Sequence, residues 1–105
     1  MAEPAALLVG HWRHSHEEDD GGDRVYRRED FPFPPSRGRR GLEFLAGGDL
    51  ITDDIAAGDG TDQTVGRWRL EPDGQLWLEV SGRPKTAHRL DLGELPSGRL
   101  VLHPA

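Results

Sequence analysis

A chain of 105 residues and 11.6 kDa has room for one domain, residues 1–105, around a single hydrophobic core. Its 13 basic and 19 acidic residues give a net charge of -6, which disfavours binding to nucleic acid or to an anionic membrane. Because there is no cysteine, disulfides and thiolate metal sites are excluded. The aliphatic run at residues 5–9 is too short for a membrane span or a secretory signal, so we expect a cytoplasmic protein.

Apolar residues recur at every second position over most of the chain, which predicts strands rather than helices. After one helical turn at most in residues 5–9, a first strand places Leu8, Gly10, Trp12, His14 and His16 on one face. A short strand at residues 24–27 follows. Residues 31–35, Phe-Pro-Phe-Pro-Pro, cannot donate a continuous ladder of hydrogen bonds, so this segment is expected to be extended and lid-like.

The remaining apolar segments read as strands joined by tight turns. Residues 41–45 and 49–56 predict a hairpin around Gly47-Gly48, and residues 65–70 and 75–80 predict another around Asp73-Gly74. Two further strands are expected at residues 86–92 and 99–103. Seven to eight short strands with little or no helix favour a small up-and-down antiparallel barrel, because closing the sheet removes its edges. An open sandwich, or a barrel completed by a second copy in a homodimer, would also cover the core.

The segments Gly10-His11-Trp12 and Gly66-Arg67-Trp68 resemble the Gly-x-Trp signature of the calycins, the lipocalin and avidin-type barrels. The resemblance implies that the glycine of the first copy allows a close approach of chains and that its tryptophan plugs one end of the barrel. The second copy makes the chain similar to compact bacterial lipocalin-like domains. The chain departs from typical lipocalins in its short length and in lacking a C-terminal helix and a disulfide, so the resemblance implies a fold and transfers no ligand.

Two histidines at alternate positions suggest a metal site. On a strand His14 and His16 project to the same face as Trp12, and a His-x-His pair can give two nitrogen ligands to a divalent transition metal. His88 shares a face with Leu90 and is the candidate third ligand. The alternative is that both histidines leave the barrel and neutralise the acidic residues 17–20. Acid–base catalysis by these histidines is a further alternative, so an enzyme remains one hypothesis.

A barrel of this kind can instead hold a small organic molecule in its mouth, which is concave, apolar at the base and polar at the rim. Arginines at residues 37–40 could clamp an anion, because a guanidinium matches a carboxylate or phosphate. The alternative is that the aromatic residues only fill the core. The leading hypothesis is a lipocalin-like barrel that binds a small molecule, and a protein-interaction module using residues 31–35 is a third. The candidate ligand-binding residues are Trp12, His14, His16, Tyr26, Phe33, Arg39, Phe44, Trp68 and His88.

Overall fold

The computed structural model describes residues 4–35, 39–55, 61–82 and 84–104, and within them it shows eight strands, one short α-helix and two 3-10 helices. The helices are α1 (Pro4–Leu8), η1 (His16–Glu18) and η2 (Leu95–Ser97). The strands are β1 (Gly10–His14), β2 (Arg24–Arg28), β3 (Gly41–Phe44), β4 (Asp49–Ile55), β5 (Thr61–Leu70), β6 (Gln75–Val80), β7 (Thr86–Leu90) and β8 (Arg99–Pro104). No helix of the described residues is long and apolar enough to cross a membrane.

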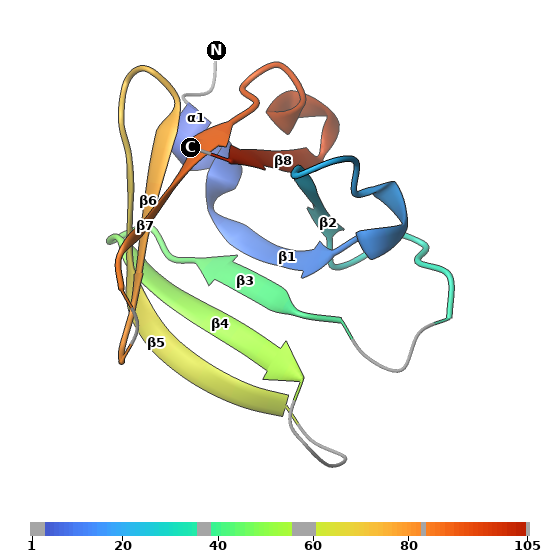
Figure 1. Cartoon of the computed structure of the whole chain (residues 1–105), viewed down its shortest axis with the longest axis horizontal. Helices are drawn as coiled ribbons and strands as arrows, with labels where there is room; N and C mark the ends of the chain where they lie inside the picture. Colours follow the sequence, from blue (N-terminus) through green and yellow to red (C-terminus); the bar gives the residue numbers. More distant parts are fainter. Residues whose placement is uncertain (1–3, 36–38, 56–60, 83, 105) are drawn as a thin grey trace.

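All eight strands pair antiparallel and close into one barrel in the order β1-β2-β8-β7-β6-β5-β4-β3 (Figure 1). The predicted all-β barrel of seven to eight strands is therefore confirmed. From β3 to β8 consecutive strands are neighbours, as in an up-and-down meander. The first hairpin departs from that order, because β2 lies between β1 and β8 while β3 pairs with the other edge of β1.

This departure explains the long connection at residues 29–40. Both β2 and β3 are antiparallel to β1, so they run in the same direction on either side of it. Strands that run in the same direction need a crossover of about a dozen residues, whereas an antiparallel pair needs only a tight turn. The Phe-Pro-rich segment is part of this crossover. Its two aromatic rings stack edge to face at 5.0 Å, and Arg27 and Arg39 each lie over one ring, at 4.7 and 4.5 Å.

One end of the barrel, called here the helix end, is filled by α1, η2 and the largest core side chains. Trp12 is fully buried, and its indole Nε1 donates a 2.8 Å hydrogen bond to the carbonyl of Leu8. The Arg28 guanidinium lies 3.9 Å from the centre of that indole and donates to the carbonyls of Val9 and Leu7. Other fully buried side chains here are Leu8, Phe44, Leu50, Leu76 and Leu100.

Gly10 permits this packing. Its φ of 132° lies in the region that favours glycine, and a Cβ built there would collide with the Arg28 guanidinium. The tryptophan of the first Gly-x-Trp thus fills the helix end, with an arginine on its face.

Most predicted strand boundaries lie within one residue of the observed ones, but three differ by more. The strand predicted from residue 65 begins at Thr61. The prediction that the first strand continues to His16 is wrong, since β1 ends at His14 and His16 begins the 3-10 helix η1. The Ser15 amide still donates to the Val25 carbonyl of β2, and beyond it the chain turns into η1, where the Ser15 hydroxyl donates to Glu18 at 2.7 Å and the Glu18 amide donates to the Ser15 carbonyl. At the other end, β7 stops at Leu90, and Leu92 is exposed in the following turn. The helical turn expected in residues 5–9 is confirmed as α1.

Candidate functional site

The end of the barrel opposite α1, called here the mouth, encloses a cavity of about 350 Å³. Toward the helix end β3, β4 and β6 carry Phe44, Leu50 and Leu76, which are fully buried in the core. The described lining residues are Arg24, Tyr26, Arg40, Gly41, Leu42, Thr52, Leu78, Val80, Pro84 and Thr86.

The cavity wall is apolar on several sides and cationic at one. Leu42, Leu78 and Val80 supply hydrocarbon from β3 and β6. Arg24 and Tyr26 lie on the same face of β2 and both line the cavity, where Tyr26 is buried and Arg24 is exposed. Burial raises the pKa of Tyr26, while the charges of Arg24 and Arg40 and a hydrogen bond with Arg24 oppose the rise. The phenol is protonated at neutral pH and has one proton to donate.

His14 and His16 lie near each other, but each imidazole contacts a carboxylate of its own. The ring of His14 packs 5.1 Å from that of Tyr26, and its Nε2 lies 2.9 Å from Asp19 Oδ2. The ring of His16 is 6.1 Å from that of His14, with its Nε2 3.7 Å from a Glu17 carboxylate oxygen. The alternative reading of the motif, in which these histidines neutralise the acidic loop, describes their contacts.

The third proposed ligand, His88, belongs to a different part of the barrel. It is half-buried on β7, where burial and then the charge of Arg24 lower its pKa. It lines a separate hollow with Asp73, Gln75 and Arg89. No group of three histidine, aspartate or glutamate side chains in the described part of the chain could hold a metal ion. The predicted metal site at His14, His16 and His88 is not formed there.

The structure also separates the aromatic residues that the sequence had placed in one ligand wall. Trp12 and Phe44 belong to the core of the helix end, and Phe44 stacks edge to face on Trp68 at 5.5 Å. Phe33 lies in the crossover beneath Arg39. That arginine pairs with Glu17 at 2.6 Å and donates to the carbonyls of residues 14 and 34. Of the nine candidate ligand-binding residues, Tyr26 is the one that lines the cavity.

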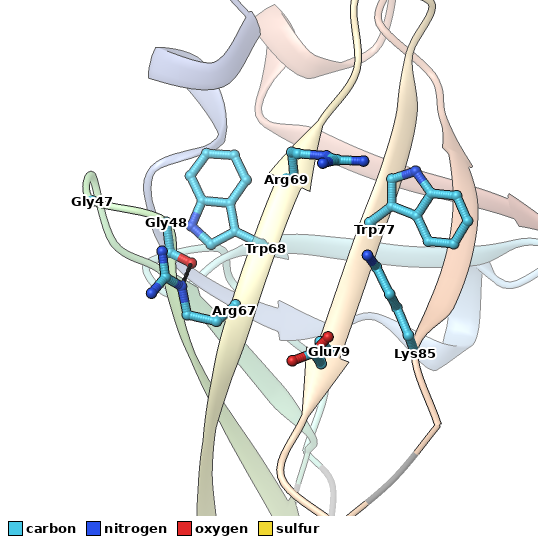
Figure 2. A pocket seen from close by; sticks show the side chains of 8 residues that line it. All are labelled: Gly47, Gly48, Arg67, Trp68, Arg69, Trp77, Glu79 and Lys85. Atoms are coloured by element: carbon cyan, nitrogen blue, oxygen red, sulfur yellow. Dashed lines mark hydrogen bonds between the residues drawn. The ribbon is translucent and has the colours of Figure 1, made fainter.

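A second hollow, of about 440 Å³, lies on the outer face of β5 and β6 (Figure 2). Its cations already have partners. Arg69 pairs with Glu71 at 2.7 Å, Arg67 donates to the Gly48 carbonyl at 3.1 Å, and the Lys85 ammonium lies 5.0 Å from the centre of the Trp77 ring. Glu79 adds a carboxylate to the same surface. The outer groove is therefore open and largely charge-compensated.

Comparison with known proteins adds no assignment, since no family model, curated protein or solved structure matches the chain.

Sequence reasoning missed most of the cavity wall. Alternation in residues 75–80 puts Leu78 and Val80 on one face of a strand, and alternation in residues 24–27 would put Arg24 and Tyr26 on one face. Together these two faces hold four of the lining residues, of which only Tyr26 is aromatic. The emphasis on tryptophan and histidine concealed it, because those residues fill the helix end or pair with carboxylates.

Proposed function

We propose that this protein binds a small molecule in the cavity at the mouth of its barrel. The observation that carries the proposal is the cavity of about 350 Å³, which lies within the size range of ligand sites, about 300–1,000 Å³. Its lining combines apolar side chains with a few polar groups that converge from neighbouring strands, the usual composition of such sites. A filled interior would have left no space for a ligand.

The likeness to calycins supports the same proposal. Gly10 admits Arg28, Trp12 plugs the helix end, and the opposite end stays hollow, an arrangement suited to ligand binding at the mouth. Membership of a compact bacterial lipocalin-like family stays a prediction. The cytoplasmic location, the homodimer and the enzymatic alternative likewise stay predictions.

The experiment is a thermal-shift and calorimetric screen of small amphipathic molecules against two matched variants. Thr86→Trp puts an indole into the mouth from an exposed position of β7, and Arg89→Trp puts the same side chain on the outer face of the same strand. We expect compounds that stabilise the wild type and Arg89→Trp but not Thr86→Trp. If no compound in the screen binds, or if binding survives Thr86→Trp unchanged, the cavity is not a ligand site.

A further inference from the structure

We infer that the ligand is a small amphipathic carboxylic acid in its ionised form, held by its carboxylate at Arg24 and Tyr26 and by its hydrocarbon part against Leu42, Leu78 and Val80. This inference rests on the proposed function and adds the chemical class of the ligand.

The charge of the cavity is the first argument. Two arginines line it, and no carboxylate is found among its described lining residues. Elsewhere Arg27, Arg39 and Arg69 each have a glutamate within 2.8 Å. The Arg24 guanidinium instead forms a hydrogen bond with the Tyr26 phenol, and no carboxylate of the described lining lies beside it. A guanidinium without a carboxylate partner can form a charge-assisted hydrogen bond with an anionic ligand.

The available donors are the second argument. Thr52 and Thr86 line the cavity, but their hydroxyls donate to the carbonyls of Thr64 and Leu78, at 3.3 and 3.4 Å. A hydroxyl has one proton to donate, so these threonines offer the cavity acceptors only. The Tyr26 phenol, two residues from Arg24, is protonated at neutral pH and accepts a hydrogen bond from that guanidinium, so its own proton remains to be donated. A guanidinium and a phenol that converge on one side match a single acceptor-only group such as a carboxylate.

The distribution of hydrocarbon is the third argument. The apolar lining comes from Leu42 on β3 and from Leu78 and Val80 on β6, two strands that do not pair with β2. A ligand with charge at both ends would leave one charge against hydrocarbon, which is costly. At about 350 Å³ the cavity is at the lower limit for ligand sites, so the molecule is small, with one charged head and a short apolar body.

The test uses three eight-carbon probes that differ only in their head group: octanoate, 1-octanol and octylammonium. Calorimetry at neutral pH should rank octanoate first, about tenfold or more tighter than octanol, with octylammonium weakest. Arg24→Gln should weaken octanoate about tenfold and leave octanol unchanged, since one charged hydrogen bond is lost. Tyr26→Phe should weaken octanoate by a smaller factor. Arg69→Gln, which removes an exposed arginine of the outer groove, is the matched control and should change neither.

The outcomes separate this inference from the proposed function. If octanol binds as tightly as octanoate, and Thr86→Trp blocks both, the cavity is a ligand site but the carboxylate class is wrong. If octanoate binds equally to wild type and Arg24→Gln, the head group does not sit at Arg24 and the inference fails. If neither probe binds the wild type at millimolar concentration, the carboxylate class is again wrong, and the wider screen with Thr86→Trp decides the proposed function alone.

Discussion

The two ends of the barrel are held by different forces. At the helix end large apolar side chains exclude water completely, and Arg28 packs flat on Trp12. At the mouth, ion pairs hold η1 in place: Arg27 pairs with Glu18, and Arg39 pairs with Glu17. Side chains alternate between the inside and the outside of the barrel at both ends, so this alternation alone does not decide which end is hollow. Side-chain volume and the cover provided by α1 decide it.

The largest effect on the free energy of unfolding should come from truncating a core side chain, and it should differ between the two ends of the barrel. Trp12→Ala should lower the free energy of unfolding by about 3–5 kcal/mol, because it opens a large void in a sealed region. Leu78→Ala should cost only about 1–2 kcal/mol, below the usual range for leucine, because Leu78 already borders the cavity. Denaturant titration of both variants checks this. Equal losses would show that the mouth is packed as tightly as the helix end.

The next effect concerns the glycine that admits Arg28. Gly10→Ala should cost about 2–3 kcal/mol, since the added methyl meets the guanidinium and the φ of 132° disfavours any side chain. Gly21→Ala is the matched control: its φ is also positive, at 61°, but nothing lies within 4 Å of the added carbon. It should cost about 1 kcal/mol. A Gly10→Ala variant as stable as Gly21→Ala would contradict a tight fit at Arg28.

Acid should loosen the mouth before the helix end. Hydrogen bonds from Arg27 lower the pKa of Glu18 from 4.5 to about 2, and those from Arg39 do the same for Glu17. A depressed carboxyl pKa contributes stability that is complete above pH 4.5 and is lost as pH falls through about 2. Glu18→Gln should therefore cost about 1 kcal/mol at pH 7 and almost nothing at pH 2.

Hydrogen exchange by residue between pH 5 and pH 2 measures this difference directly. We expect amides of η1 and β2 to lose protection while Trp12 fluorescence stays unchanged. Simultaneous loss of both signals, with the same pH dependence in Glu18→Gln, would show that these ion pairs do not stabilise the mouth separately.

The smallest effect is expected on the outer groove. Lys85→Ala removes an exposed ammonium from the Trp77 ring and should change the free energy of unfolding by no more than about 0.5 kcal/mol. Octanoate affinity should stay the same, because Lys85 lies outside the barrel (Figure 2). Calorimetry of octanoate binding to this variant distinguishes the two hollows. Weaker binding would show that octanoate binds in the outer groove and not at the mouth.

Much of the fold was predictable from local patterns. Alternation in residues 65–70 and 75–80, with Asp73-Gly74 between them, predicted the β5–β6 hairpin, and the register pairs Leu70 with Leu76. The position of β2 could not be predicted in this way, because its partner β8 lies far along the chain. A hairpin pattern predicts which residues form the turn, but it does not predict which distant strand pairs with the outer edge of the hairpin.

The candidate site was predicted less well, for a physical reason. β1 ends at His14 and His16 begins the 3-10 helix η1, so counting by twos from Trp12 fails after His14. Histidines beside carboxylates form ion pairs more readily than they gather around a metal in an incomplete ligand set. Tyr26 lines the cavity as the polar residue that the sequence suggested.

The pairing of β2 with β8 has a consequence for how the molecule is assembled during synthesis. Val25 of β2 pairs with Val101 of β8, which is synthesised almost last. One edge of β2 therefore has no hydrogen-bond partner until nearly the whole chain has left the ribosome. Contacts this distant in sequence slow folding and expose the nascent edge to other chains. Truncation before β8 would leave β2 and β7 each with one unpaired edge, and such fragments should aggregate rather than form a smaller barrel.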